Sequence, residues 1–192
     1  MISLYAQNSQ GNVAMQLFEQ MQEKGISPNE ITSVTLLSMC VNQTYLKEGQ
    51  RMHTFILENK LASSTLVGNC LVNMYGKCGS LEDARGIFDN IFIRDVVLWS
   101  AIINVYAQHG YGREVVQLFD EMKRGKVVPN KITYVSVLSA CSRAGMINEA
   151  REYFDSMSQI YGIVPTVEHY ACMADVFGRA GLLIEAENFL RK

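Results

Sequence analysis

The sequence contains little of what an enzyme or a membrane protein needs. Only 19% of its 192 residues are charged, and only 3 are proline. No apolar run approaches the roughly 20 residues that span a bilayer. There is no Gly-rich phosphate loop, and no His-x-Glu pattern followed by Cys-x-x-Cys, as zinc-dependent deamination requires. We therefore expect no enzymatic activity, no cofactor, no small-molecule substrate and no membrane partner.

Cysteine and histidine are also too few, and too scattered, to form a site. Of the 5 cysteines, four form two pairs at equivalent points of the repeat described below: Cys40 with Cys141, and Cys70 with Cys172. Such recurrence is typical of buried helix residues and argues against a disulfide. The histidines have no partner at metal-ligand spacing, and we expect His53 to be packed in the core. The sequence thus predicts no metal site.

What the chain does contain is an internal repeat, visible as three ladders with steps of 35, 35, 31, 35 and 36 residues. The first ladder is one of small residues: Ala14, Gly49, Ala84, Val115, Ala150 and Ala186. The second ladder is one of turn-forming residues: Ser9, Thr44, Gly79, Gly110, Gly145 and Gly181. The third is mostly aromatic: Phe18, His53, Phe88, Phe119, Phe154 and Leu190. A period of this length is typical of a helical solenoid.

One repeat, residues 96–130, predicts a hairpin of two helices. Its first half has apolar residues at helical spacing, and Gly110 then interrupts the pattern. Its second half, residues 113–125, is amphipathic, and Pro129 closes the unit. We expect the small residues to mark the closest approach of the second helix to the first. The aromatic residues should fill the space between neighbouring hairpins.

Several segments resemble the plant organellar pentatricopeptide repeat proteins of the subclass that alternates P-type, L-type and S-type motifs. LVNMYGKCGSLEDARGIFD (71–89) resembles an S-type motif, and VVLWSAIINVYAQHGYGREVVQLFDEMKRGKVVPN (96–130) resembles a P-type motif. Residues 132–166 and 167–192 resemble the last L-type and S-type pair of such an array. Tetratricopeptide repeats are excluded because their strict 34-residue period and their signature are absent.

The resemblance implies an all-α fold, a right-handed superhelical solenoid of helix-turn-helix repeats in a single array. The expected repeats are 1–29 (partial P-type), 30–64 (L-type), 65–95 (S-type), 96–130 (P-type), 131–166 (L-type) and 167–192 (partial S-type). Because both ends fall inside a repeat, we expect a fragment that ends in the last S-type repeat, or a truncated gene model.

In this family the fifth and the last residue of a motif recognise one RNA base. Carried over, the S-type repeat provides Asn69 with Asp95, which implies uracil, and the P-type repeat provides Ser100 with Asn130, which implies adenine. The expected target is a 5′-UA-3′ step. The alternative for Asn69 and Ser100 is ordinary helix N-capping. The L-type repeats have valine at the fifth position, which cannot bond a base edge.

Two further sets of positions are implied by the same resemblance. Apolar second residues would sandwich the bases: Leu66, Val97 and Ile132, with Ile31 as the equivalent residue of the first L-type repeat. Their alternative role is simple packing. Basic residues at the thirteenth position would contact phosphate: Lys77, Arg143 and Arg179, where the other two repeats have Asn42 and Gln108. Their alternative role is that of a solvated helix end.

The function implied is sequence-specific binding of single-stranded organellar RNA, most often at a site of C-to-U editing, together with proteins of the editing complex. The compartment would be the mitochondrion or, alternatively, the chloroplast, although no transit peptide is visible. The net charge of -2 gives no support to RNA binding, because phosphate contacts need local positive charge. A protein-interaction scaffold and an inactive gene fragment therefore remain as alternatives.

Overall fold

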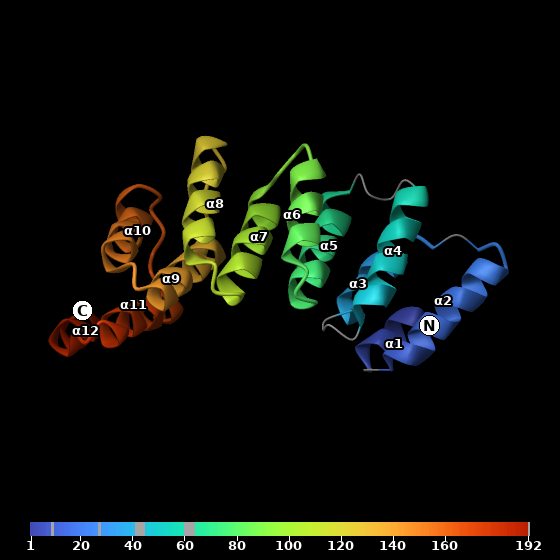
Figure 1. Ribbon diagram of the computed structural model, residues 1–192, viewed down its shortest axis with the longest axis horizontal. Coiled ribbons are helices and arrows are strands. Elements are labelled where there is room, and N and C mark those ends of the chain that lie inside the picture. The colour runs from blue at the N-terminus through green and yellow to red at the C-terminus, as the bar shows by residue number, and fades with distance from the viewer. Residues whose placement is uncertain (9, 27, 41–44, 60–63, 192) are drawn as a thin grey trace. The chain divides into compact units, whose positions relative to one another are not determined.

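The computed structural model describes residues 1–8, 10–26, 28–40, 45–59 and 64–191. Within these ranges the chain is all-helical, with no β-strand, and successive helices pair as antiparallel hairpins (Figure 1). The chain divides into two compact units, residues 1–94 and residues 95–192. The expectation of an all-helical repeat array is confirmed.

The first unit contains three hairpins. Their helices are α1 (Ile2–Gln7), α2 (Gly11–Glu23), α3 (Glu30–Met39), α4 (Leu46–Glu58), α5 (Thr65–Lys77) and α6 (Leu81–Asn90).

The second unit contains three more hairpins. Their helices are α7 (Val96–Gln108), α8 (Gly112–Arg124), α9 (Lys131–Ala144), α10 (Ile147–Gln159), α11 (Val167–Arg179) and α12 (Leu183–Leu190).

The first helix of each hairpin starts beside a polar residue that ends the preceding repeat. Helices α3, α5, α7, α9 and α11 begin at residues 30, 65, 96, 131 and 167, which are the first residues of the expected repeats. Asn29, Asp95 and Asn130 each accept a hydrogen bond from the backbone N–H three residues later, at 2.9 Å. Such caps satisfy helix N–H groups that have no partner within the helix.

The turn within a hairpin depends on glycine where the sequence predicted it. Gly79, Gly110, Gly145 and Gly181 have φ of 81°, 82°, 69° and 75°, a left-handed conformation that strains other residues. At the end of α9, the N–H of Met146 reaches back past Gly145 to the carbonyl of Cys141 at 2.9 Å. Ser9 and Thr44, the other members of this ladder, lie outside the described residues.

The core is built from the other two ladders. Ala14, Ala84, Val115 and Ala150 are fully buried, and Phe88 and Phe119 are buried beside them. The ring of Phe119 makes edge contacts with Tyr134 of α9 and Tyr153 of α10, with centroids 5.3 and 5.2 Å away. Burying one such ring contributes about 1.5–3 kcal/mol, so the aromatic ladder joins neighbouring hairpins as expected. In the last hairpin Leu190 is exposed.

The expected contact of the small residue Gly49 is wrong. The small residues were expected to mark the closest approach of the two helices within a hairpin. A Cβ added to Gly49 of α4 would lie 2.4 Å from Sδ of Met74. Met74 belongs to α5, the first helix of the next hairpin. At this position the absent side chain therefore lets two successive hairpins approach each other, since the second helix packs onto the following repeat.

Candidate nucleic-acid interface

The two expected base-recognition residues at fifth positions are not helix caps. Asn69 and Ser100 are each the fifth residue of their helix, α5 and α7, and the caps of those helices are Ser64 and Asp95. Both side chains are largely buried, with 8% and 6% of their surface exposed. The capping alternative is therefore wrong for Asn69 and Ser100. Capping belongs instead to last residues of repeats, since Asp95 caps α7 and Asn130 caps α9.

The structure brings Ser100 and Asn130 into one hydrogen-bonded group, although 30 positions separate them in the sequence. Oγ of Ser100 lies 2.7 Å from Oγ1 of Thr133, the third residue of α9. The Thr133 hydroxyl in turn lies 3.0 Å from Oδ1 of Asn130. Oδ1 of Asn130 also accepts the Thr133 N–H at 2.9 Å. A residue from the following repeat therefore connects the two predicted recognition residues of the P-type repeat.

Asn69 has a buried acceptor that no described residue satisfies. Among the described residues, no donor lies within hydrogen-bonding distance of its side-chain Oδ1. A buried carbonyl oxygen without a partner costs about 1–3 kcal/mol, and such groups are uncommon in native proteins. Its expected companion Asp95 is exposed and is the first residue of the second compact unit. The Oδ1 of Asn69 is therefore an unsatisfied buried acceptor within the described part of the chain.

The apolar second residues are exposed. Leu66, Val97 and Ile132 keep 54%, 54% and 66% of their surface accessible, and Ile31 keeps 69%. Core packing, the alternative given above, therefore does not explain their apolar character. Each lies near the start of the first helix of its repeat, three residues before the fifth position in the sequence. An exposed aliphatic side chain at this height can contact the face of a flat aromatic ligand.

The three basic residues at the thirteenth position differ in their bonds. Nη1 of Arg143 donates to the carbonyl of Ala107, near the end of α7, at 2.6 Å, and Nη2 contacts Oγ of Ser139. Nε of Arg179 donates to Asp175 at 2.9 Å. Arg143 and Arg179 therefore bond within the protein. This agrees with their alternative role as residues of a helix end, where a cation offsets the helix dipole.

Lys77 is the basic residue best suited to contact an external anion. It lies in the last turn of α5, is exposed, and makes no ion pair with any residue that the structure describes. It lines a pocket of about 330 Å³ together with residues of α3 and α5, among them Ser38 and Asn73. Of the other members of this set, Gln108 is exposed, and Asn42 lies outside the described residues.

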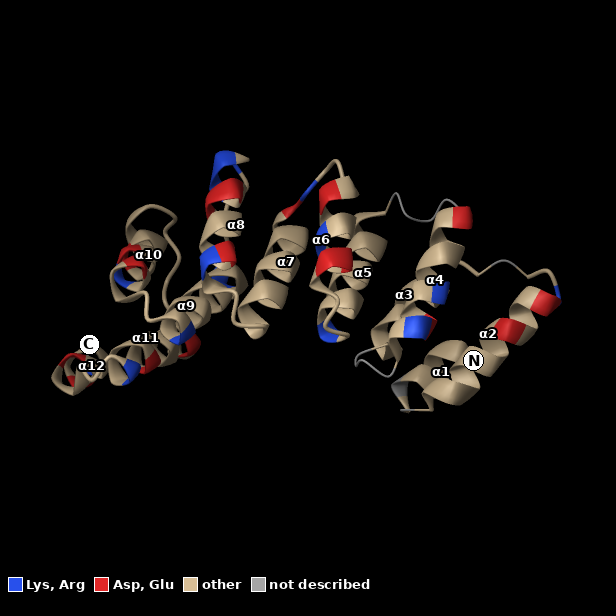
Figure 2. Cartoon of the chain, in the orientation of Figure 1, with Lys and Arg blue, Asp and Glu red and all other residues tan. Residues whose placement is uncertain are grey.

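Charge is divided between the first and second helices of the repeats (Figure 2). Helix α7 has no charged residue, and neither α5 nor α9 has an acidic one. The second helices carry most of the acid, with three acidic residues each in α6, α8 and α10. Of the other first helices, α3 has one acidic residue and α11 has two. The acidic residues behind the net charge of -2 therefore lie mainly on the second helices.

The histidines and cysteines have structural roles. His53 lies 2.9 Å from the hydroxyl of Tyr75, and burial lowers the pKa of His53. His169 accepts the N–H of Thr166 and contacts the Lys131 carbonyl at 3.0 Å, and burial lowers its pKa as well. Burial raises the pKa of the Cys141 thiol to about 12. The described residues contain no group of histidine, cysteine and carboxylate side chains that could hold a metal.

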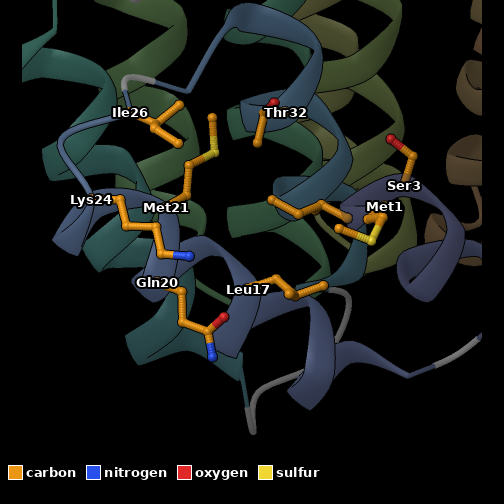
Figure 3. Close-up of a pocket in the computed structure, with 9 residues that line it drawn as sticks. Met1, Ser3, Leu17, Gln20, Met21, Lys24, Ile26 and Thr32 are labelled. Atoms are coloured by element: carbon orange, nitrogen blue, oxygen red, sulfur yellow. The ribbon is translucent and has the colours of Figure 1, made fainter.

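A second pocket, of about 370 Å³, is lined by residues between Met1 and Thr32 (Figure 3). Met1 and Ser3 of the first hairpin line it, together with Leu17 and Met21 of α2. It adjoins the short helix α1 and contains none of the predicted recognition residues. We therefore do not assign it to the interface. Among the described helices, none is long and apolar enough to cross a bilayer.

The hairpins, and the side chains that recur at fixed helix positions, define a helical-repeat protein whose first helices carry few charges. The sequence matches the model of the PPR repeat family over residues 1–42 and 94–143, and a second PPR repeat model over residues 69–94 and 132–160. The chain belongs to the pentatricopeptide repeat family.

Relatives from Arabidopsis thaliana match over nearly the whole chain. The chloroplastic pentatricopeptide repeat-containing protein At4g35130 is 43% identical over 191 residues, which cover 100% of this chain and 24% of the relative. The chloroplastic protein CRR2 is 41% identical and the mitochondrial protein At2g03880 is 42% identical, with 29% and 30% of their lengths covered. The chain thus spans 24–30% of the length of these relatives.

Solved structures agree on the fold. The crystal structure of PPR10 in complex with an 18-nt psaJ RNA element superposes with a TM-score of 0.76 at 22% identity, covering 100% of this chain and 29% of that chain. The nuclear proteinaceous RNase P 2 of A. thaliana gives a TM-score of 0.70 at 10% identity, covering 92% and 40%. At these identities the similarity shows the fold alone.

Thr133 belongs to this site but was not predicted from the sequence. It is fully buried, and its hydroxyl connects Ser100 to Asn130. A signal was present, because Thr32 and Thr133 occupy the same position three residues after an asparagine. The spacing is that of a capping box, which would have predicted the bond to Asn130 but not the bond to Ser100.

Proposed function

We propose that this chain binds single-stranded RNA and selects the bases that it binds. The observation that carries the proposal is the hydrogen-bonded group of Ser100, Thr133 and Asn130 at the start of α9. It connects the fifth and the last residue of one repeat. In arrays of this kind, two or three side chains of each repeat recognise one base. The RNA named with PPR10 supports the same class of ligand.

The chemistry at the P-type repeat fits adenine. Oδ1 of Asn130 accepts two hydrogen bonds from Thr133, so the Nδ2 amide is the group left to meet a base. An amide N–H can donate to N1 of adenine, whereas guanine and uracil present an N–H at that edge. The short side chain of Ser100 leaves room for a purine.

The chemistry at the S-type repeat fits uracil. Oδ1 of Asn69 is a buried acceptor without a partner among the described residues, and uracil can supply an N3–H donor. The carboxylate of Asp95 can only accept, which also favours a base with an N–H at its edge. Together with the P-type repeat, this predicts a 5′-UA-3′ step.

Two sets of contacts would complete the site. The exposed side chains of Leu66, Val97 and Ile132 would stack against the bases, and stacking contributes about 1–3 kcal/mol per base. Lys77 would contact phosphate, which adds affinity without sequence preference. Arg143 and Arg179 would do so only after exchanging the bonds that they make within the protein.

The finer assignment is to the subclass with alternating P-type, L-type and S-type motifs, and to recognition of sites for C-to-U editing. The motif order within residues 30–166 supports the subclass. The relatives named chloroplastic and mitochondrial support an organelle, with the mitochondrion as our first choice. In this role the chain binds the RNA, alongside other proteins of the editing complex, and the deamination is performed elsewhere.

A second candidate function is a protein-interaction scaffold. Val34 and Val135 favour it, because these fifth residues of the L-type repeats are half-buried and cannot bond a base edge. On this account the L-type repeats would face a protein, and the chain would bind RNA and protein through different repeats or protein alone.

The test is direct binding of short fluorescent single-stranded RNAs to the folded chain, measured by anisotropy. We expect an RNA with a UA step to bind more tightly than the same RNA with CC in its place. Asn69→Ser should shift the preferred first base from uracil toward a purine, because a short hydroxyl replaces the amide. A base preference that is unchanged by Asn69→Ser would contradict the assignment, and equal binding of all RNAs would favour the scaffold.

A further inference from the structure

Thr133 occupies a position from which it can control both recognition residues of the P-type repeat. It belongs to the next repeat, where it is the third residue of α9, and its side chain is fully buried. Its hydroxyl lies 2.7 Å from Oγ of Ser100 and 3.0 Å from Oδ1 of Asn130. It also accepts the backbone N–H of Asn130 at 3.2 Å. One hydroxyl therefore takes part in three contacts.

Only one arrangement of protons makes all three contacts hydrogen bonds. A hydroxyl has a single proton and two acceptor lone pairs. One lone pair of Thr133 receives the Asn130 N–H, and its proton must go to Oδ1 of Asn130, because a carbonyl oxygen cannot donate. The remaining lone pair must then receive the proton of Ser100.

This arrangement decides what the site offers to a base. Ser100 donates its only proton to Thr133, so Oγ of Ser100 can only accept a hydrogen bond from a ligand. Both lone pairs of Asn130 Oδ1 are occupied by the N–H and the O–H of Thr133, so its Nδ2 faces a ligand as a donor. The acceptor of Ser100 and the donor of Asn130 are complementary to the N6–H donor and the N1 acceptor of adenine. Guanine has the opposite polarity, with an acceptor at O6 and a donor at N1–H.

We propose that Thr133 is a positioning residue for base selection by the P-type repeat, because it fixes the proton of Ser100 and the amide orientation of Asn130. The inference rests on the proposed RNA binding and deepens it. It makes recognition by this repeat depend on a third side chain, supplied by the repeat that follows.

The chain contains a comparison that separates this role from capping. Thr32, 101 positions earlier, bonds Oδ1 of Asn29 at 2.9 Å through both its N–H and its hydroxyl. Among the described residues, the Thr32 hydroxyl bonds Asn29 and no fifth residue of a repeat. After the S-type repeat the third position is Leu98, which has no hydroxyl. The complete arrangement therefore exists at Thr133.

The experiment compares Thr133→Val, which keeps the shape and removes the hydroxyl, with Thr133→Ser, which keeps the hydroxyl. Thr32→Val is the matched control, since it removes the equivalent cap bond elsewhere. Each variant of the chain is tested on four RNAs that differ only in the base after uracil. Melting followed by circular dichroism reports folding, and Thr133→Ala is made in parallel in case the valine variant does not fold.

We expect Thr133→Val to reduce the preference for adenine over guanine by about tenfold, the loss of one oriented hydrogen bond, with the preference for uracil at the neighbouring base retained. Thr133→Ser and Thr32→Val should keep the adenine preference within about twofold. The inference is overturned if Thr133→Val and Thr133→Ala keep the wild-type preference while Ser100→Ala loses it, a result that leaves the proposed function standing. A wild-type chain without any base preference would overturn the proposed function as well.

Discussion

Replacing Asn130 with aspartate should reverse the base preference of the P-type repeat without unfolding it. The carboxylate can keep both bonds that Oδ1 of Asn130 now accepts from Thr133, at 2.9 and 3.0 Å. Aspartate is as good an N-cap as asparagine, and Asp95 fills this role for α7, where it accepts the Leu98 N–H at 2.9 Å. The change is therefore confined to the atom that faces a base, where an acceptor replaces the Nδ2 donor.

The magnitude follows from the hydrogen bonds that change. With adenine, one bond of about 1 kcal/mol is lost, and N1 is left facing an oxygen, which costs about 1–3 kcal/mol more. With guanine, the N1–H gains a charged acceptor. We expect the ratio of the dissociation constants for adenine and guanine RNAs to change by about 30-fold or more, which corresponds to roughly 2 kcal/mol.

The assay is fluorescence anisotropy with two RNAs that differ only at this base, at constant salt. The added negative charge weakens both complexes, so the ratio is the informative quantity. Circular dichroism should show the helix content and melting temperature of the parent chain. A folded Asn130→Asp variant whose ratio changes by less than about threefold would refute the reasoning.

Three substitutions and one alkylation experiment test the phosphate contact, the base contact, the helix packing and the burial of Cys141. Lys77→Ala should weaken binding to every RNA alike and reduce the slope of log K against log salt by about 0.7, whereas a selective loss for one base would argue against a phosphate contact. Val97→Ala should weaken RNA binding without lowering the melting temperature, because this side chain is exposed; a lower melting temperature would mean that it packs. Gly112→Val should destabilise the second unit by about 1–3 kcal/mol, because an added Cβ would lie 2.6 Å from Cβ of Ala144, and an unchanged melting temperature would contradict that close approach. Burial holds the pKa of Cys141 at about 12, above the usual range for a thiol, so the thiol stays protonated at pH 8 and should resist alkylation until the chain unfolds.

The repeat fold was predictable because packing imposes a strict period on the sequence. Residues such as Phe119 and Gly145 recur at a fixed position of the repeat, so their roles could be predicted from that recurrence. The direction of the close approach at Gly49 was not predictable, since a small residue shows that two helices meet but not which two. The sequence therefore assigned this contact to the wrong pair of helices.

The candidate site was predictable only in part. The positions of Ser100 and Asn130 in the repeat follow from the register, but their union through Thr133 depends on side-chain geometry across two repeats. The partners of Arg143 could not be foreseen either, because a long side chain can reach either solvent or a neighbouring helix end. Net charge could not show how the acidic residues are distributed, since three lie on each of α6, α8 and α10 and none on α5, α7 or α9.

The most direct test of the central claim is selection of bound RNA from a random single-stranded pool, with the folded chain as bait. The account predicts enrichment of a UA step. It also predicts that exchanging the two fifth residues, Asn69→Ser with Ser100→Asn, replaces this step with a purine followed by a pyrimidine. Enrichment of no sequence by a chain shown to be helical, or of the same sequence by both proteins, would contradict the claim that these residues select bases.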